Sequence, residues 1–174
     1  GSAHDTTAHE MPPLAPGETA RYFVNARFPD LDCLTATFTT HTYAPHTHDT
    51  YVIGAVAAGV EVWNARGRRH FAGPGDVLFN LPLDVHDGMP HAGGYSYRMT
   101  YPSEAFLTEL AGEVAGRRQG APWFRDNVVH DPEGAALFDA AHRLLERGGD
   151  GLAAEEWLTA AYARVLRLHA GVAA

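Results

Sequence analysis

The chain of 174 residues has one cysteine, Cys33, and no hydrophobic run long enough to cross a membrane. A single cysteine cannot form an internal disulfide, which favours a reducing compartment, and we expect Cys33 to be a small buried hydrophobic residue. The longest apolar stretches fall well short of the roughly 20 residues that a membrane-spanning helix needs, and no signal peptide opens the sequence. We therefore predict a cytoplasmic protein that makes no membrane contact.

Positive charge is also scarce, because 13 basic residues face 21 acidic ones and the formal net charge is −8. Proteins that bind nucleic-acid phosphates need a basic surface, so the excess of acidic residues argues against direct binding of DNA or RNA by this chain. The basic clusters, Arg66-Gly67-Arg68-Arg69 and Arg117-Arg118, fall in predicted turns, where we expect them to be solvated.

The common motifs of nucleophilic, nucleotide-dependent and peptidase chemistry are missing. There is no Gly-x-Ser-x-Gly, no phosphate-cradling glycine loop and no His-Glu-x-x-His. Any chemistry in this chain must therefore rest on residues that the fold brings together.

The length suits one domain with three parts. Residues 1–19 read as a flexible arm, in which Gly1-Ser2 is interpreted as an expression-vector scar. Residues 20–102 contain short strands separated by turns at Ala58-Gly59, Arg66-Gly67 and Gly73–Asp76, which is typical of a β-sandwich or small barrel. The predicted strands are Arg21–Val24, Cys33–Thr39, Tyr51–Val56, Val60–Trp63, Arg69–Phe71, Val77–Phe79 and Tyr95–Tyr101.

Residues 103–174 are predicted to be helical, because the hydrophobic period changes to 3.6 after Pro102. Ser103 is the expected N-cap of one helix, and Asp131-Pro132-Glu133 is the expected start of a second that ends at Gly148-Gly149. The last helix, from about Leu152 to Gly171, carries an apolar stripe that suits antiparallel packing or a subunit interface. That stripe consists of Leu158, Ala161, Val165 and Leu168.

Three histidines are the most informative feature of the chain. Alternate residues of a strand point to the same face, so His46 and His48 should project side by side from one strand. The segment Gly75–Val85 is a strand and a turn that can bring His86 back against them. Imidazole nitrogens bind Zn²⁺ and other first-row metals well, so we predict that the three rings meet in a metal site or in a polar pocket for a small ligand.

The spacing of these histidines resembles the cupin pattern, in which one motif supplies His-x-His and a glutamate and a second motif supplies another histidine. Val52 or Ile53 stands where that glutamate would be, so the carboxylate ligand is missing. Two interpretations stay open. The histidines line a cavity through hydrogen bonds alone, or they hold a divalent metal, with Zn²⁺ first and Ni²⁺ or Fe²⁺ as alternatives. No organic cofactor is predicted.

An ordered set of motifs, taken together, resembles one family, the N-terminal sensor and dimerisation domain of AraC-type transcription regulators. The similarity runs from about Tyr22 to Leu168. The segments that carry it are His46–Gly54, Gly73–Val77, Pro82–Gly88 and Tyr95–Pro102.

This resemblance implies a mainly β fold with C-terminal α structure: a single jelly-roll-like cupin barrel (20–102) followed by two to three dimerising helices (103–174). It also implies a small-molecule effector inside the barrel, a homodimer, and DNA binding through a C-terminal helix-turn-helix domain that is absent here. The N-terminal arm is expected to fold over the effector. By this reading the chain is not an enzyme, and its acidic balance fits because DNA contact belongs to the missing part.

The effector contacts are predicted on the strand Tyr95–Tyr101, whose odd residues form an apolar face. Periodicity turns Tyr95, Tyr97 and Met99 into the barrel, and the resemblance places Tyr97 and Met99 where effector contacts lie, with core packing as the alternative. Arg98 then points outward, toward a helix or an acidic residue. Trp63 either lines the pocket or covers the barrel.

Two other functions remain open at this stage. One is a metal-dependent cupin enzyme in which His46, His48 and His86 hold the ion and leave a position for substrate. The other is a sensor in which the metal is structural or helps to bind an effector's oxygens.

Overall fold

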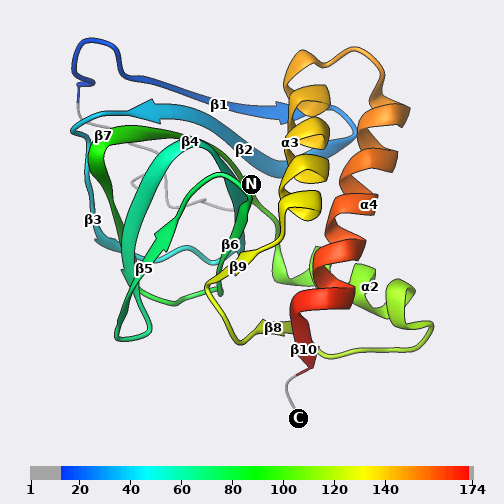
Figure 1. Ribbon diagram of the computed structural model, residues 1–174. Helices are drawn as coiled ribbons and strands as arrows, with labels where there is room; N and C mark the ends of the chain where they lie inside the picture. Colours follow the sequence, from blue (N-terminus) through cyan, green and yellow to red (C-terminus); the bar gives the residue numbers. More distant parts are fainter. Residues whose placement is uncertain (1–12, 173–174) are drawn as a thin grey trace.

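A computed structural model describes residues 13–172 as a β-barrel-like half joined to a helical half (Figure 1). Short runs of β-branched and aromatic residues with alternating burial form the strands, as such residues do on a pleated, half-buried surface. The strands are β1 (Thr19–Asn25), β2 (Phe28–Phe38), β3 (Tyr43–His46), β4 (Val52–Ala65), β5 (Arg68–Ala72), β6 (Asp76–Asn80), β7 (His86–Tyr101), β8 (Pro122–Phe124), β9 (Val128–His130) and β10 (Ala170–Val172).

The main sheet has the strand order β1-β2-β7-β4-β6-β9, with β3 paired to β7 and β5 paired to β4. These ladders are antiparallel, and the sheet curls in a jelly-roll-like manner without closing into a complete barrel. β9 comes from the stretch between the first two helices and adds an edge strand beside β6. The mainly β fold with C-terminal helices is therefore confirmed, and β10 with β8 makes a separate small sheet.

Two predicted strand limits are wrong. Ala58-Gly59, the expected turn, lies inside β4, and β7 begins at His86 instead of Tyr95, so that Gly93 and Gly94 lie inside it. The register of the two strands shifts there, and Gly59 and Gly94 have φ of 71° and 96°. A Cβ on Gly59 would collide with the Gly94 carbonyl oxygen, so the glycines let both long strands bend together where a turn was expected.

The three described helices begin where the sequence predicts. They are α2 (Glu104–Ala115), α3 (Pro132–Arg147) and α4 (Gly151–His169). The Ser103 hydroxyl accepts the Phe106 N–H, and the Asp131 carboxylate accepts the Gly134 N–H. α3 ends at Gly148, whose φ of 72° suits a residue without a side chain.

The apolar stripe of α4 is only partly as predicted. Leu158, Ala161 and Val165 are buried, whereas Leu168 is exposed. Tyr162 and Leu166 take its place in the core, because α4 packs against both α3 and α2 and so buries a wider face than one stripe. Figure 1 shows α3 and α4 side by side against the barrel.

Two hydrophobic cores result. One lies between the sheet and the helices and contains Phe79, Phe138 and Leu158, together with Cys33, which is buried as expected. Burial raises the pKa of the Cys33 thiol to about 12, so this thiol stays protonated and is a poor nucleophile. The other core lies inside the curled sheet and contains Phe38 and Trp63.

The joint between barrel and helices is built on Arg98. This side chain leaves β7 on the face opposite to Tyr97 and Met99 and reaches α3, as predicted. Its guanidinium donates to Glu146 at 2.8 Å and to His142 Nδ1 at 2.9 Å. The other ring nitrogen of His142, Nε2, donates to the Met99 carbonyl oxygen at 2.9 Å.

This joint predicts an acid-sensitive fold. Burial, reinforced by the Arg98 charge, lowers the pKa of His142 to about 4 from its usual 6.5. Between pH 6.5 and 4, this histidine is therefore protonated in the unfolded chain but not in the folded chain. The free energy of unfolding must fall as the pH falls through that range. We expect the free energy of unfolding, measured by urea titration with chelator present, to drop by about 2 kcal/mol from this histidine between pH 7 and 5.

His142→Gln is the matched control for that prediction, because its amide can still donate to Met99 but does not titrate. The free energy of unfolding of this variant should depend less steeply on pH, by the slope that corresponds to about one proton taken up on unfolding. Burial also lowers the pKa of His86 to about 4, so part of the slope must remain. An unchanged slope in His142→Gln would contradict the assignment.

Residues 1–12 of the predicted arm lie outside the described residues. Within 13–19, the Glu18 carboxylate accepts the backbone N–H groups of Ala15, Thr39, Thr40 and His41. These bonds hold the pKa of Glu18 at about 2 and tie the start of β1 to the loop before β3. In the described part of the chain, no helix is both long and apolar enough to span a bilayer.

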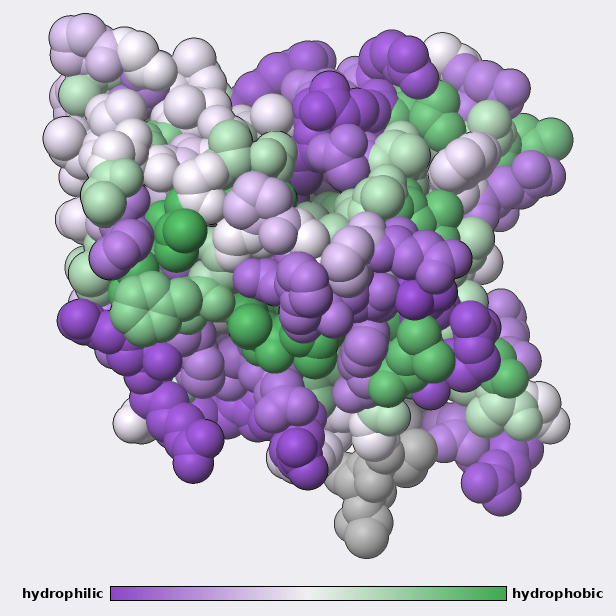
Figure 2. All heavy atoms as spheres, viewed as in Figure 1, coloured by the Kyte–Doolittle hydropathy of each residue, from purple (hydrophilic) through white to green (hydrophobic). Residues whose placement is uncertain are grey.

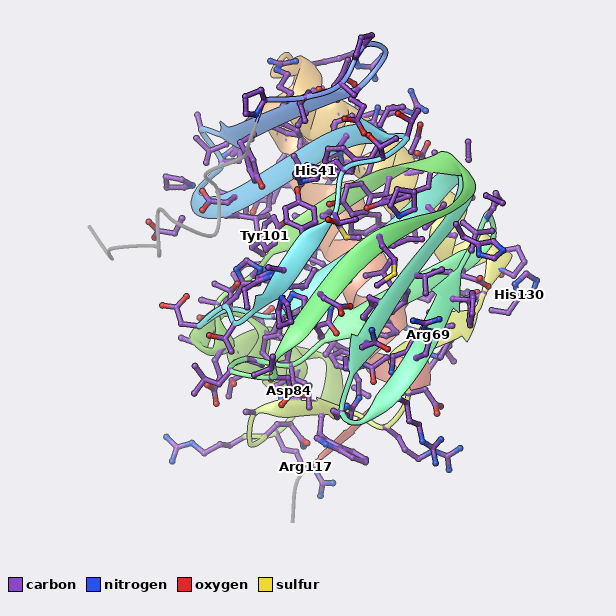
Figure 3. All side chains as sticks on the ribbon, turned by 90° about the vertical axis from the view of Figure 1, so that its left-hand side faces the viewer. His41, Arg69, Asp84, Tyr101, Arg117 and His130 are labelled. Atoms are coloured by element: carbon purple, nitrogen blue, oxygen red, sulfur yellow. The ribbon has the colours of Figure 1, made fainter. Side chains whose placement is uncertain are left out.

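The arginine clusters lie on the surface. Arg117 and Arg118 are exposed just after α2, as expected, whereas Arg68 and Arg69 are exposed but open β5 instead of lying in the turn. Arg66 also departs from the prediction, because its guanidinium donates to the Phe124 carbonyl oxygen at 2.8 Å and to the Asn127 side chain at 3.1 Å. Figure 3 shows the Arg117 and His130 side chains at the periphery of the molecule, whereas Tyr101 lies among the strands.

Candidate functional site

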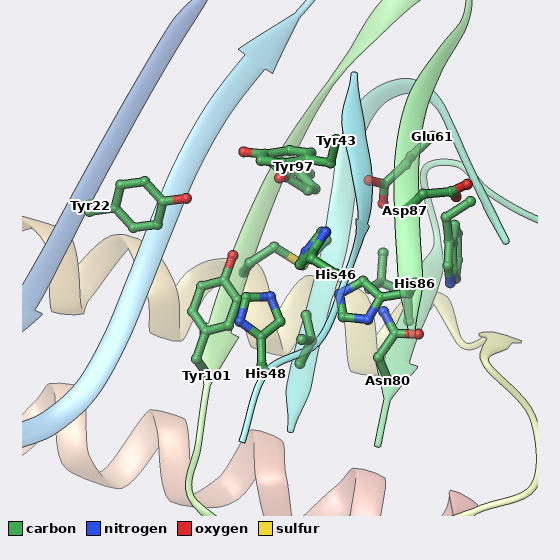
Figure 4. A pocket seen from close by; sticks show the side chains of 14 residues that line it. Tyr22, Tyr43, His46, His48, Glu61, Asn80, His86, Asp87, Tyr97 and Tyr101 are labelled. Atoms are coloured by element: carbon green, nitrogen blue, oxygen red, sulfur yellow. The ribbon is translucent and has the colours of Figure 1, made fainter. Parts of the chain in front are cut away.

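A polar cavity lies inside the curled sheet and has a volume of about 40 Å³ (Figure 4). Strands β1, β3, β4, β6 and β7 and the loop after β3 all contribute to its wall. The lining residues are Tyr22, Tyr43, His46, His48, Val52, Glu61, Trp63, Leu78, Asn80, His86, Asp87, Tyr97, Met99 and Tyr101.

The three predicted histidines meet in this wall. The ring centroids lie 5.0 Å apart for His46 and His48, 4.5 Å for His46 and His86, and 5.2 Å for His48 and His86. One ring nitrogen from each lies within 4.8 Å of the other two. The local structure differs from the prediction in one respect, because β3 ends at His46 and His48 stands in the following loop.

Backbone carbonyls orient two of these rings. The Nδ1 atom of His46 lies 2.7 Å from the Ala44 carbonyl oxygen, and that of His86 lies 3.1 Å from the Asp84 carbonyl oxygen. A carbonyl only accepts, so both Nδ1 atoms carry a proton, and Nε2 is the atom through which each ring would bind a metal in its neutral form. Burial and the neighbouring His46 lower the pKa of His86 to about 4, which keeps this ring neutral at physiological pH.

This donor set fits a divalent metal. Three imidazoles are the protein ligands of many Zn²⁺ sites, and a hydrogen bond from the other ring nitrogen to a backbone carbonyl, as His46 and His86 make here, is a usual way of orienting them. Nitrogens at the Zn–N distance of about 2.0–2.1 Å sit about 3.3 Å from one another, so the three nitrogens, which lie within 4.8 Å here, would draw closer around a bound ion.

The predicted effector contacts occupy different places. Tyr97 and Met99 line the cavity, and so does Trp63, whose position the sequence left undecided. Tyr95 is buried one step further along β7, where its ring packs against Phe38 and Tyr97.

Several lining residues were missed by sequence reasoning. Glu61, Asp87, Asn80, Tyr22 and Tyr43 all face the cavity. For Glu61 a signal existed, because it alternates with Trp63 in the strand Val60–Trp63 and an acidic residue on the buried face of a strand is unusual. The other four residues lie in segments where the sequence gives no such sign of a polar residue on a buried strand face.

Glu61 brings a carboxyl group to the cavity wall from the middle of β4, but it is not one of the residues whose ligand atoms converge with those of the histidines. Burial raises its pKa to about 8, so at neutral pH it is mostly protonated and can donate a hydrogen bond. Asp87 is held differently, because its carboxylate accepts the backbone N–H of Asn64 at 2.6 Å and its side-chain amide at 3.0 Å. Figure 4 shows both carboxyl groups on the same side of the cavity as His86.

Tyrosine hydroxyls cover the opposite side. Tyr22 is hydrogen-bonded to Tyr43 and Tyr101, and Tyr43 is hydrogen-bonded to Tyr97. Burial raises the pKa of Tyr43 and of Tyr101, so the phenols are neutral donors and acceptors. The cavity thus has three histidines that could hold a metal at one end and a set of neutral hydroxyl groups at the other.

Comparison with the solved structure of an AraC-like activator supports the fold. The AraC-like transcriptional activator CuxR superposes with a TM-score of 0.60 at 13% identity, over 94% of this chain and 62% of CuxR. KdgF from Halomonas sp. gives a TM-score of 0.43 at 21% identity, over 59% of this chain and 94% of KdgF. A cupin 2 conserved barrel domain protein from Leptotrichia buccalis gives 0.46 at 12% identity, over 55% of this chain and 46% of that protein.

At the level of sequence, no curated protein matches the chain. A family model does match: the AraC-like ligand binding domain covers residues 28–161, from β2 to the middle of α4. The match includes the three histidines, the strand that carries Tyr97 and Met99, and the helices. The chain therefore belongs to the family of AraC-like ligand-binding domains.

Proposed function

We propose that this chain is the effector-sensing and dimerising part of a cytoplasmic transcription regulator. Its family, its internal cavity and the acidic surface of the chain support this role. DNA binding would belong to a separate C-terminal helix-turn-helix domain, because a chain with a net charge of −8 is poorly suited to phosphate contact.

The sensor site in this proposal is a centre for a divalent metal, with Zn²⁺ first and Ni²⁺ or Fe²⁺ as alternatives. The observation that carries it is the convergence of His46, His48 and His86, with the Nδ1 atoms of two of them engaged by backbone carbonyls. A bound ion would bring positive charge into the cavity and attract oxygen atoms of an effector.

Metal analysis tests this centre directly. We expect protein purified without a metal-affinity column to contain close to one equivalent of a divalent metal, and chelator to lower its melting temperature. Elemental analysis and thermal unfolding measure the two quantities. Less than a tenth of an equivalent, with no stabilisation on adding any of the three metals, would contradict the proposal.

Strand β7 supplies a route from the cavity to the helices. Met99 lines the cavity, and its carbonyl oxygen accepts from His142 of α3. Arg98, the residue before it, binds Glu146 of the same helix. An effector that moves β7 would therefore move α3, and it shifts the equilibrium only by its different affinity for the two arrangements.

The dimer interface is proposed on the outer face of α4. Trp157 and Leu168 lie three helical turns apart on one side of that helix and are 45% and 52% exposed. Hydrophobic residues also emerge between hydrophilic ones on the helical half of the surface in Figure 2. Exposed large apolar residues on a regular helix face are common at subunit contacts.

Charge at that face should dissociate the dimer. We expect Trp157→Glu with Leu168→Glu to weaken the dimer at least about 100-fold, because two buried apolar contacts become buried carboxylates. Light scattering coupled to gel filtration measures the mass. Phe71→Glu is the control, since Phe71 is similarly exposed but lies on β5, and its variant should stay dimeric. A clean wild-type monomer at high micromolar concentration would refute the interface.

The runner-up function is a metal-dependent cupin enzyme. The observation in its favour is that two carboxyl groups, on Glu61 and Asp87, share the cavity with the histidines. Turnover would need the ion to keep a position open for substrate. A metal-loaded protein that releases a chemically altered ligand would support this alternative over the sensor.

A further inference from the structure

The cavity wall carries no fixed positive charge. None of the described residues that line it is an arginine, the chain has no lysine, and residues 1–12 contain neither residue type. Two acidic residues, Glu61 and Asp87, lie in this wall. A negatively charged ligand would therefore find no attractive charge in this wall unless a metal ion supplied it.

One donor in the wall has no partner. Trp63 is 1% exposed, and its indole N–H has no hydrogen-bond acceptor among the described residues. The ring itself is packed, with His70 at a centroid distance of 5.4 Å. A buried N–H without an acceptor is costly, so the indole N–H of a residue that lines a ligand cavity is a candidate donor to a bound ligand.

The size of the cavity limits that ligand. About 40 Å³ holds only a few water-sized groups, whereas sites for drug-sized molecules have volumes of roughly 300–1,000 Å³. An ion and a ligand of four or five heavy atoms would fill this space. A sugar or an aromatic acid would need the strands to move apart.

We propose that the metal-loaded cavity binds a compact carboxylate of two or three carbon atoms, with Trp63 Nε1 as its hydrogen-bond donor. The metal supplies the attractive charge, and the indole N–H binds a carboxylate oxygen. This inference rests on the proposed metal centre and adds two things to it: the class of effector and the residue that selects it.

The experiment uses Trp63 as its own reporter. The other two tryptophans, Trp123 and Trp157, are exposed and lie outside the cavity, so Trp123→Phe with Trp157→Phe leaves Trp63 as the sole indole fluorophore. Zn²⁺ is titrated first by calorimetry. Acetate, glycolate and the neutral isostere acetamide are then titrated into the metal-free and the Zn²⁺-loaded protein, with fluorescence and calorimetry as readouts.

We expect acetate and glycolate to bind the Zn²⁺-loaded protein at least about 100-fold more tightly than the metal-free protein. The affinity for acetamide should rise far less when Zn²⁺ is bound. If Zn²⁺ binds but does not raise the affinity for acetate and glycolate, the inference is overturned and the proposed metal centre is still supported. Absence of Zn²⁺ binding would overturn both.

A second variant isolates the indole N–H. Trp63→Phe keeps an aromatic ring but removes the donor, so in the Zn²⁺-loaded protein acetate should bind about 10-fold more weakly by calorimetry. Zn²⁺ affinity should stay as in wild type, which shows that the variant is folded and that its site is intact. Unchanged acetate affinity in a Zn²⁺-binding variant would overturn the assignment of Trp63.

Discussion

Replacing His48 with alanine is expected to lower Zn²⁺ affinity by at least about 100-fold, because even the loss of a partner behind a metal ligand costs 10- to 100-fold and His48 is a ligand itself in the proposed centre. Wild-type protein at a free Zn²⁺ concentration of about 100 times Kd should gain about 2.7 kcal/mol of stability. For a domain of this size that gain is roughly 5–10 °C in melting temperature. The variant should show neither the gain nor the bound metal.

The control for this prediction is His91→Ala. His91 is an exposed histidine of β7 that contacts the ring of Phe71 and lies outside the cavity. Its variant should keep the metal content and the Zn²⁺-dependent melting shift of wild type. A His48→Ala protein with wild-type metal content and melting temperature would refute the three-histidine centre.

Replacing Arg98 with methionine is expected to destabilise the protein by about 2–4 kcal/mol, because it leaves charged and polar groups of α3 without their partner. Arg98 is 11% exposed and binds Glu146 at 2.8 Å and Asp139 at 3.4 Å. The His142 Nδ1 atom would also lose the donor that it faces. Methionine keeps most of the apolar stem, so urea titration of the variant reports mainly the lost polar contacts.

Arg21→Met is the matched control. Arg21 binds the other oxygen of the same Glu146 at 3.1 Å, but its side chain is 63% exposed. Exposed ion pairs contribute little, so this change should alter the free energy of unfolding by no more than about 0.5 kcal/mol. Equal effects of the two substitutions would show that burial of the Arg98 joint does not stabilise the protein.

The two predictions are linked through β7. His86 opens β7 at the cavity, and Arg98 leaves the same strand toward α3. If β7 transmits the state of the cavity, bound Zn²⁺ should change hydrogen exchange in α3 of the wild type and should do so less in Arg98→Met.

Much of the fold follows from local sequence. Ser103 and Asp131 mark helix starts because their side chains satisfy free N–H groups at the next turn, and this chemistry involves only neighbours in the chain. Gly148 ends α3 for an equally local reason. The alternation of Tyr97, Arg98 and Met99 was enough to predict which of the three faces the helices.

The sequence was less informative where distant segments decide the outcome. Ala58-Gly59 looks like a turn, but it is a bend within β4, because Gly94 of β7 approaches Gly59 so closely that both strands must curve together. Leu168 fits the helical stripe of α4, yet it is exposed, because the face of α4 that packs against the other helices carries Tyr162 and Leu166.

The candidate site shows the same division. The types and spacing of His46, His48 and His86 identified the metal ligands proposed here, since strand periodicity and imidazole chemistry are properties of the chain itself. The cavity around them depends on which strands become neighbours. Only the tertiary structure placed Glu61 and Trp63 in one wall with the histidines. Among residues 13–172, it also left the indole N–H without an acceptor and the wall without an arginine, because burial and charge at a site are set by residues that are far apart in sequence.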